Sequence, residues 1–328
     1  MTTVSIIVPC YNEQNTICLL LDALYAQDYT RSQIGVIVAD GLSTDRTREE
    51  IVEFQATHPD LSVLVIDNLD HTIPTGLNRA IEASQGDIIV RLDAHSIPRP
   101  DYVSRIVKAL ESGLGDNVGG IWEIQSGGKG IQARSISIAA AHVLGVGDAL
   151  YRYTNHAQIV DTVPFGAFYR SLIEQIGPYD EALLTNEDYE FNARLRKAGG
   201  TIWLDPSIRS IYFARSTYRE LASQYWRYGF WKAQMLRGYP DTIKWRQALP
   251  PLFILSLAAL LILAVWFPIA IWILLAEVMI YMLVLLTAGI AVSIKHRDPA
   301  LLMGVPMAIV TMHFSWGIAF LWGMFKKA

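Results

Sequence analysis

The sequence has few cysteines, and no stretch at its start is typical of a secretory signal. Its 328 residues include two cysteines, Cys10 on a predicted strand and Cys18 on the helix that follows. Without an export signal, we expect both to be reduced core residues rather than a disulfide. For the same reason we expect about the first 240 residues to stay in the cytoplasm.

Two nucleotide-binding loops and a basic surface are also missing. No Gly-x-Gly-x-x-Gly motif follows the first predicted strand and no Walker loop is present, which argues against a dinucleotide-binding or P-loop domain. The net charge of −4 argues against a nucleic-acid partner. Charged residues become rare after Pro250, and this apolar end raises the mean hydropathy to +0.27.

Strand and helix patterns alternate over about the first 90 residues, which predicts a doubly wound α/β domain with a mostly parallel sheet. Three helical patterns lie between the strand patterns: the first ends at about Gln27, the second starts near Arg46 and the third covers Gly76–Ala83. Apolar runs typical of buried strands lie at Val4–Cys10, Ile34–Ala39, Leu61–Ile66 and Asp87–Leu92.

The predicted strands end in polar residues, among them Glu13, Asp40 and Asp93. Parallel strands place such residues on one edge of the sheet, where carboxylates repel each other unless a cation lies among them. Asp93 and His95 are two apart, so on an extended segment both side chains point the same way. They could hold a divalent metal that also binds a diphosphate. Alternatively, Asp93 caps a turn and His95 is a surface residue.

Two further features each allow two interpretations. The glycine-rich runs Gly119–Trp122 and Gly145–Ala149 are either turns that let the backbone approach a sugar or ordinary loops. The acidic run Asn186–Glu190 starts a predicted helix, where acids suit the positive end of the helix dipole even without a catalytic role.

The runs VSIIVPCYNE, ADGLSTDRT and GDIIVRLDAH together resemble the nucleotide-binding half of family 2 glycosyltransferases of the GT-A fold. The resemblance covers roughly residues 1–215. It implies that the nucleotide is bound by Pro9, Tyr11, Glu13, Asp40 and Asp93.

The family's Asp-x-Asp metal motif reads Asp-Ala-His here, which implies a divalent ion, Mn²⁺ or Mg²⁺, on Asp93 and His95. Histidine suits Mn²⁺ better than Mg²⁺. The acid pair Glu187 and Asp188 is similar to the family's catalytic Glu-Asp motif. The resemblance implies that Asp188 is the general base of an inverting transfer.

Longer phrases, GVGDALYR, DTVPFGAFYR, NEDYEFNARLRKAGG and QYWRYGFWKA, resemble membrane-bound bacterial exopolysaccharide glucosyltransferases of the succinoglycan type. The run Gln224–Tyr228 is similar to the Gln-x-x-Arg-Trp motif of polysaccharide synthases. This implies an acceptor site at Gln224, Trp226 and Arg227. The alternative is a helix at the membrane surface, because aromatic and basic residues, Lys232 among them, alternate here.

Three apolar segments end the sequence, Pro250–Phe267, Ile269–Ile294 and Leu301–Phe325. Each is long enough to cross a hydrocarbon core of ~30 Å. Pro268 predicts a hairpin between the first two, and the basic residues beside them place both hairpin ends in the cytoplasm. The third segment either spans or is re-entrant. Glu277 is either functional or pairs with His313.

We therefore expect three regions: a catalytic domain at 1–215, an amphipathic interface segment at 216–249 and a transmembrane region of about three helices at 250–328. The expected reaction moves a hexose from a nucleotide-diphosphate sugar, UDP-glucose or similar, to a polyprenyl-diphosphate-linked glycan. It would take place on the cytoplasmic face of a bacterial-type inner membrane, in exopolysaccharide or cell-surface glycan synthesis. The alternatives are a polyprenyl-phosphate monoglycosyl synthase and an inactive nucleotide-binding membrane protein.

Overall fold

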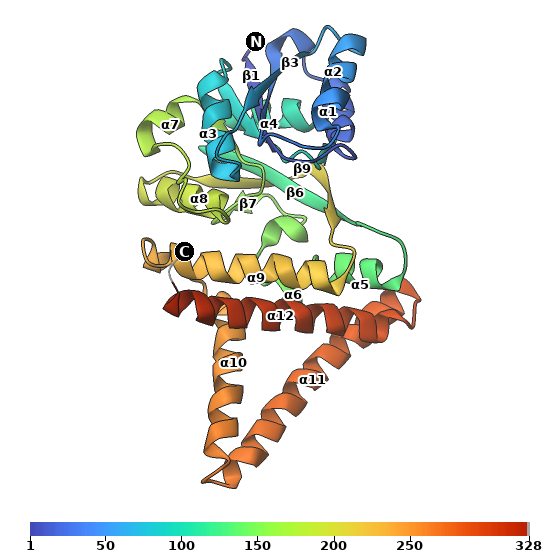
Figure 1. The fold of residues 1–328 in the computed structure, drawn as a ribbon, viewed down its shortest axis with the longest axis vertical. Coiled ribbons are helices and arrows are strands. Elements are labelled where there is room, and N and C mark those ends of the chain that lie inside the picture. Colours follow the sequence, from blue (N-terminus) through green and yellow to red (C-terminus); the bar gives the residue numbers. More distant parts are fainter. Residues whose placement is uncertain (327–328) are drawn as a thin grey trace. The chain divides into compact units, whose positions relative to one another are not determined.

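The structure is a computed structural model that describes residues 1–326, and the chain forms two compact units (Figure 1). The first consists of Met1–Glu123 and Ala149–Tyr212, and the second of Ile124–Asp148 and the residues from Phe213 onward. The insertion Ile124–Asp148 lies within the sequence-predicted catalytic domain but packs with the helices Tyr218–Met235 and Leu301–Phe325 of the second unit.

The strands of the described residues form one nine-stranded sheet in the order β3-β2-β1-β4-β8-β6-β9-β5, with β7 paired to β9. The four strands β1 to β4 are parallel, as predicted. Strand β8 pairs antiparallel with β4 and β6, and β5 and β7 pair antiparallel with β9, so the sheet is mixed. The strands are β1 (Val4–Cys10), β2 (Ile34–Asp40), β3 (Ser62–Asp67), β4 (Ile88–Arg91), β5 (Ile97–Pro98), β6 (Asn117–Ser126), β7 (Gln158–Ile159), β8 (Ala167–Tyr169) and β9 (Ile202–Ala214).

Helices cover both faces of this sheet, which explains why its parallel strands are continuous apolar runs. One core packs α1, α2 and α4 against the sheet, and a second core packs α3 and α8 against the other face. Helix α3 begins three residues earlier than predicted, because Thr72 accepts a hydrogen bond from the Thr75 N–H and Pro74 suits a first turn. The helices are α1 (Ile17–Tyr25), α2 (Thr47–Thr57), α3 (Ile73–Ala83), α4 (Tyr102–Glu111), α7 (Ser171–Ile176) and α8 (Glu187–Lys197), with 3₁₀ turns at Arg31–Gln33 and Leu150–Arg152.

The glycine pair Gly119–Gly120 lies within strand β6 and not in a turn that could contact a sugar. A Cβ atom on Gly120 would overlap the carbonyl oxygen of Ile208 on β9. Because they have no side chain, these glycines allow the backbone of β6 to lie close to its neighbours in the sheet.

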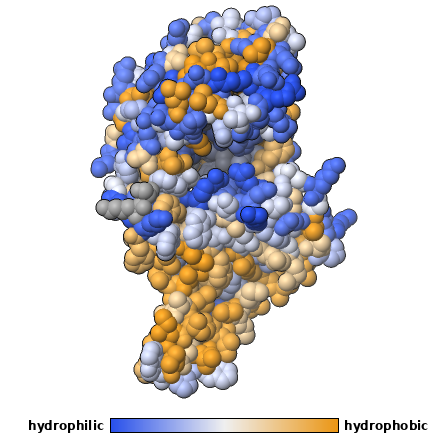
Figure 2. Space-filling view, in the orientation of Figure 1, coloured by the Kyte–Doolittle hydropathy of each residue, from blue (hydrophilic) through white to orange (hydrophobic). Residues whose placement is uncertain are grey.

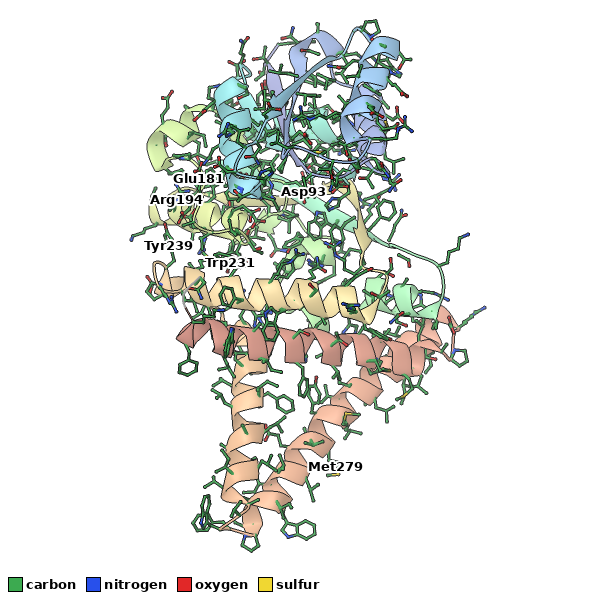
Figure 3. All side chains as sticks on the ribbon, viewed as in Figure 1. Asp93, Glu181, Arg194, Trp231, Tyr239 and Met279 are labelled. Atoms are coloured by element: carbon green, nitrogen blue, oxygen red, sulfur yellow. The ribbon has the colours of Figure 1, made fainter. Side chains whose placement is uncertain are left out.

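The second unit contains two helices that expose apolar side chains along most of their length, α10 (Trp245–Leu263) and α11 (Ile269–His296). They form a hairpin whose surface is almost entirely hydrophobic (Figure 2), with Met279 on its exposed side (Figure 3). Among the described residues, these two and α12 (Leu301–Phe325) are long and apolar enough to cross a membrane. The unit also contains α5 (Ile131–Ala139), α6 (Val143–Val146), α9 (Tyr218–Met235) and a 3₁₀ turn at Pro240–Thr242.

Helix α12 differs from the hairpin because it packs alongside α9 over nearly its whole length (Figure 1). The Tyr218 hydroxyl donates to the Gly304 carbonyl at 3.1 Å near one end, and the Gln234 amide donates to the Gly323 carbonyl at 2.9 Å near the other. Between them, a Cβ on Gly229 would overlap the backbone of Trp316. As a result, 44% of the most apolar stretch of α12 is buried, against 6% for α10 and 11% for α11.

Polar residues of this unit have partners that the sequence did not predict. Glu277 accepts a hydrogen bond from Ser256 across the hairpin, so its predicted pairing with His313 is wrong. His313 instead lies 3.1 Å from the Tyr281 hydroxyl and 2.7 Å from a backbone carbonyl of α6. Lys232, predicted at the headgroup surface, is 2% exposed and donates to the carbonyl of Thr242 at 3.0 Å.

Candidate active site

Asp93 and His95 lie in a turn and not on the extended segment that the sequence predicted. Strand β4 ends at Arg91, and the turn is closed by a hydrogen bond of 2.9 Å from the Ser96 N–H to the Asp93 carbonyl. Because of this turn, the two side chains have different partners. Asp93 accepts from Arg91 at 3.3 Å, and the Nδ1 atom of His95 lies 3.0 Å from a carboxylate oxygen of Glu13.

The Glu13–His95 contact connects the loop after β1 to the loop after β4, two neighbouring parallel strands. Both side chains are partly exposed, at 24% and 35%, and that of Asp93 is 25% exposed. No group of three or more metal-ligating side chains occurs within residues 1–326. Two partly exposed ligands nevertheless suit a divalent ion whose remaining positions are filled by phosphate oxygens and water.

Of the predicted nucleotide-binding residues, Tyr11 is 53% exposed and Asp40 is fully buried. The carboxylate of Asp40 accepts hydrogen bonds from the Ser43 N–H at 3.0 Å and from Arg48 Nε at 2.5 Å. Asp40 therefore holds the loop after β2 in shape. Pro9 lies within β1, opposite Ala39 of β2, where its missing N–H fits the end of the strand.

Three of the six non-glycine residues that have positive φ in the described part of the chain lie in the loops after β1, β2 and β3. Asn12, Leu42 and His71 have φ angles of 54°, 56° and 57°, a region that side chains other than glycine rarely adopt. The loops bind one another, since the Asn12 side chain accepts from the Thr44 N–H at 2.8 Å and His71 contacts the Gly41 carbonyl at 2.7 Å. Such strained, mutually supported loops are typical of binding sites.

Arg91 joins the turn after β4 to the acidic start of α8. Its Nη2 atom lies 2.8 Å from a carboxylate oxygen of Glu187 and 3.3 Å from Asp93. Arg91 and Glu187 are each 5% exposed, whereas the neighbouring Asp188 is partly exposed. The structure thus brings together the predicted metal-binding and catalytic motifs, and it separates the two acids by burial.

Burial raises the pKa of both acids, and Arg91 opposes that rise. For Glu187, burial has the largest effect and raises the pKa. Arg91 lowers the pKa, and the neighbouring carboxylate of Asp188 raises it further. For Asp188, burial again raises the pKa, with Arg91 and the Tyr189 N–H opposing. A carboxylate with a raised pKa and partial exposure is suited to accept a proton.

Sequence reasoning did not identify Arg91 or Arg48. The signal for Arg91 was a charged residue at the end of a strand that is otherwise apolar, and such a residue is rarely buried without a partner. No comparable signal marks Arg48, since its partners Asp40 and Asp67 come from two different strands.

The family model for glycosyl transferase family 2 matches residues 5–177, more than half of the chain. A second match is the succinoglycan biosynthesis protein ExoA of Rhizobium meliloti, 30% identical over 97% of this chain and 94% of that protein. This chain belongs to glycosyltransferase family 2. It is therefore a glycosyltransferase.

Two other proteins resemble this family 2 glycosyltransferase over nearly all its length. One is the dolichyl N-acetyl-alpha-D-glucosaminyl phosphate 3-beta-D-2,3-diacetamido-2,3-dideoxy-beta-D-glucuronosyltransferase of Methanococcus voltae, 26% identical over 99% of this chain and 98% of that protein. The other is the structure of the mannosyltransferase PcManGT from Pyrobaculum calidifontis in complex with GDP-Man and Mn²⁺. It is 20% identical, covers 98% of this chain and 87% of that chain, and has a TM-score of 0.64, which shows a shared GT-A fold.

The predicted acceptor residues of the glycosyltransferase, all on α9, differ in exposure. Gln224 is buried, and its amide donates to the Tyr228 hydroxyl at 3.0 Å. Trp226 and Arg227 are exposed. Trp226 and Arg227 thus present their side chains at the surface, whereas Gln224 does not, and the acceptor site stays a prediction.

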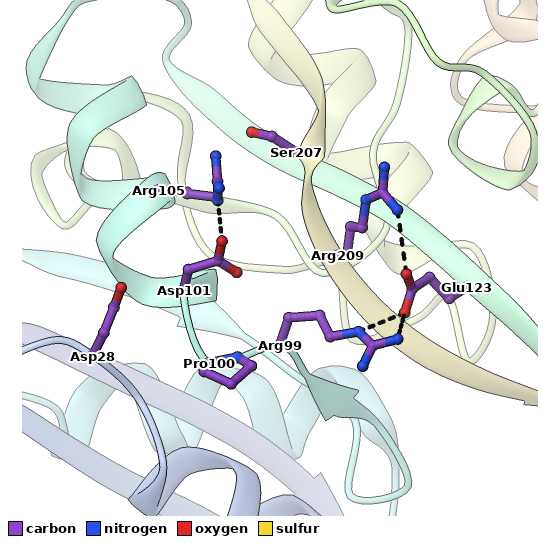
Figure 4. A pocket seen from close by; sticks show the side chains of 8 residues that line it. All are labelled: Asp28, Arg99, Pro100, Asp101, Arg105, Glu123, Ser207 and Arg209. Atoms are coloured by element: carbon purple, nitrogen blue, oxygen red, sulfur yellow. Dashed lines mark hydrogen bonds and ion pairs between the residues drawn. The ribbon is translucent and has the colours of Figure 1, made fainter.

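A cavity of about 620 Å³ in the first unit contains none of the predicted site residues (Figure 4). Its arginines are already paired: Arg99 and Arg209 contact Glu123, and Arg105 contacts Asp101. Since these cations are neutralised within the cavity, it offers little attraction to an anionic nucleotide. The lining residues are Asp28, Arg99, Pro100, Asp101, Arg105, Glu123, Ser207 and Arg209.

Proposed function

We propose that this glycosyltransferase moves a hexose from a nucleotide-diphosphate sugar to a polyprenyl-linked glycan at a membrane surface, with inversion of the anomeric carbon. The observation that carries the proposal is the bridge from Asp93 through Arg91 to Glu187, beside Asp188. It joins a site for an anionic leaving group to a candidate base at the carboxyl ends of parallel strands, where α/β folds bind ligands.

Asp188 is the proposed base. Its carboxylate takes the proton from the acceptor hydroxyl, while the acceptor oxygen bonds to the anomeric carbon and the bond to the diphosphate breaks. No second carboxylate is needed as a nucleophile, so a single displacement inverts the configuration. Asp93 and His95 would hold a divalent cation that, when bound, neutralises the charge of the leaving diphosphate.

The proposed substrates rest on the relatives. The protein from Methanococcus voltae is named for a dolichyl-phosphate-linked acceptor, and that from Rhizobium meliloti for succinoglycan biosynthesis. We propose a polyprenyl-diphosphate-linked glycan as the acceptor and UDP-glucose, or a similar UDP-hexose, as the donor.

We also propose that only α10 and α11 enter the membrane core and that α12 lies along the membrane surface with α9. Helix α9 contains Arg219, Glu220 and Arg227, and moving these charged side chains into hydrocarbon would cost free energy. Since α12 packs along α9, it lies in the same plane. Two crossings return the chain to the side on which residues 1–215 lie, which we take as the cytoplasm because basic residues flank the hairpin ends.

A transfer assay tests the reaction. The purified protein is incubated with UDP-, GDP- or dTDP-hexoses and Mn²⁺, together with either polyprenyl-diphosphate-linked glycan or polyprenyl phosphate. We expect transfer from a UDP-hexose to the diphosphate-linked glycan, with an inverted anomeric carbon by NMR. Transfer only to polyprenyl phosphate would instead indicate a monoglycosyl synthase, and binding without transfer to any acceptor would refute the proposal.

A further inference from the structure

Arg91 is a buried cation in an otherwise apolar strand. It ends β4, whose residues Ile88, Ile89 and Val90 are completely buried, and it is itself only 5% exposed. Burying a guanidinium is costly unless carboxylates or other acceptors surround it. The strand could end in an apolar residue at this position without disturbing its pattern, so the charge itself needs an explanation.

The surroundings of Arg91 are strongly acidic. Glu187 lies 2.8 Å from its Nη2 atom and Asp93 lies 3.3 Å away. Burial alone would lower the pKa of Arg91, but the charges of Glu187, Asp93 and Asp188 outweigh burial and raise it. The guanidinium therefore stays charged and is the cation that these three carboxylates share.

The contacts of Arg91 are unlike those of a salt bridge that only stabilises a fold. Its Nε and Nη1 atoms are buried and have no hydrogen-bond partner within the described residues. A purely structural ion pair can often be replaced by apolar residues with little loss of stability. Incomplete hydrogen bonding in a buried position needs an explanation, and a role in the chemistry of a site is one of the known explanations.

The contact geometry defines what that function can be. Asp93 belongs to the turn after β4, and Glu187 is the first residue of α8, which also carries Asp188. One guanidinium nitrogen thus bonds to both elements. If it shifts, the start of α8 can move relative to the Asp93 turn, and a misplacement of about 1 Å at a reacting centre can cost on the order of 10²-fold in rate.

We propose that Arg91 is the positioning residue that holds the Asp188-bearing start of α8 in register with the Asp93 turn, acting through Glu187. This inference rests on the proposed roles of Asp93 and Asp188. Arg91 and Glu187 contact neither the acceptor nor the sugar; they set the distance between the leaving group and the base. Lysine cannot replace this arginine fully, because its ammonium is a compact, strongly hydrated charge on a flexible stem, whereas the rigid guanidinium fixes the position of the nitrogen that contacts both carboxylates.

A double-mutant cycle on the full-length protein tests the inference, with Arg91→Met, Glu187→Gln, the double variant and Arg91→Lys. The control is Arg31→Met, which removes a surface ion pair to Asp60 before the amino end of β2, away from the loops of the site. For each variant, kcat and KM for the donor are measured, the concentration of competent sites is titrated with UDP and Mn²⁺, and thermal unfolding is followed.

We expect kcat per competent site to fall about 100-fold in Arg91→Met, and KM for the donor to change by less than about 3-fold, as for a residue that acts on geometry alone. In Arg91→Lys we expect a fall of about 10-fold. Adding Glu187→Gln to Arg91→Met should cost no more than about 2-fold further, because both changes remove the same contact. Arg31→Met should match the wild type.

Two results overturn the inference: kcat within about 2-fold of wild type in both Arg91 variants, or effects of Arg91→Met and Glu187→Gln that multiply. If Arg91→Met does not fold, the cycle is run with Arg91→Lys. The coupling between Arg91 and Glu187 is also measured by thermal unfolding without substrate, which does not depend on the role of Asp188. Normal turnover in Asp188→Asn would therefore refute the proposed base while leaving the Arg91–Glu187 coupling measurable.

Discussion

Placing α12 along the membrane surface predicts which residues a water-soluble label can reach from each side. The perturbation is a set of single cysteines, Val265→Cys at the tip of the hairpin, Ala300→Cys before α12 and Phe325→Cys at its end. All three positions are exposed. They are introduced after Cys10 and Cys18 are replaced by alanine.

The size of the preference follows from the packing of α12 against α9. If α12 spanned the bilayer with its packing intact, α9 would enter beside it and bring Arg219, Glu220 and Arg227 into hydrocarbon. Arg227, near the middle of α9, would lie near the bilayer centre at a cost of roughly 3 kcal/mol, whereas Arg219 and Glu220 are in its first turn, nearer the interface, and cost less. Since 1.4 kcal/mol is a factor of ten, the spanning arrangement would be populated at about one part in a hundred or less.

The hairpin brings a single acid into its span, Glu277, which accepts a hydrogen bond from Ser256. Helix α10 has 19 residues and α11 has 28. At 1.5 Å per residue, these are about 28 and 42 Å long, so α10 nearly matches ~30 Å of hydrocarbon and α11 crosses it when tilted. Its tip carries Trp266 and Trp272, which suit the opposite interface.

The assay is maleimide labelling of sealed inside-out and right-side-out vesicles with a membrane-impermeant reagent. We expect Ala300→Cys and Phe325→Cys to label from the cytoplasmic side and Val265→Cys from the opposite side. Labelling of Ala300→Cys and Phe325→Cys from opposite sides would show that α12 spans and would refute the reasoning.

Three other predictions concern the site and the packing. In Asp93→Asn and His95→Ala, the Mn²⁺-dependent part of UDP binding should weaken by about 10-fold or more, measured by calorimetry; unchanged UDP binding by the wild type after chelation would contradict a metal site. Because burial raises the pKa of Asp188, with Arg91 opposing, a base that must be deprotonated should lose activity as the pH falls through a value above that of an exposed aspartate. A transfer rate that stays constant down to the ordinary aspartate range would exclude Asp188 as the base. Gly229→Leu should overlap the backbone of Trp316 and lower the unfolding free energy by about 1–3 kcal/mol, whereas Gly238→Ala, which meets only a distant carbonyl at 3.9 Å, should not; equal stability of the two variants in denaturant titrations would argue against the tight α9–α12 contact.

The parallel half of the sheet could be predicted because β1, β2 and β4 are unbroken apolar runs separated by helical patterns. The antiparallel half was missed for two reasons. Its long strands, β6 with 10 residues and β9 with 13, contain residues that are rare in strands, Gly119 and Gly120 in β6 and Asp205 and Pro206 in β9. Strands β5 and β7 have two residues each and β8 has three, too few to show a period. Such strands are determined by their neighbours in the sheet and not by local pattern.

The site residues follow the same division. The motifs predicted Asp93, His95, Glu187 and Asp188 as candidate site residues, but the period-two argument for Asp93 and His95 was wrong, since a turn follows Arg91 at once. The bridge from Arg91 to Glu187 joins residues nearly a hundred positions apart, and no local pattern encodes such a contact.

Hydropathy had the same limit for the last helix. The composition of α12 fits a span, and the alternative of a re-entrant segment could not be decided from the sequence alone. What separates α12 from α10 and α11 is contact with α9, made possible by Gly229 and Gly323. Small residues that allow close helix packing leave no mark in a hydropathy average.

The measurement that tests the central claim most directly is donor binding and transfer in Asp188→Asn. UDP binding with Mn²⁺ is measured by calorimetry, and hexose transfer is measured on the same preparation. We expect binding within about 3-fold of wild type and transfer lowered by on the order of 10²-fold or more, as for the loss of a general base. Near-normal transfer, or a parallel loss of binding, would contradict the assignment of Asp188 as the base beside a separate leaving-group site.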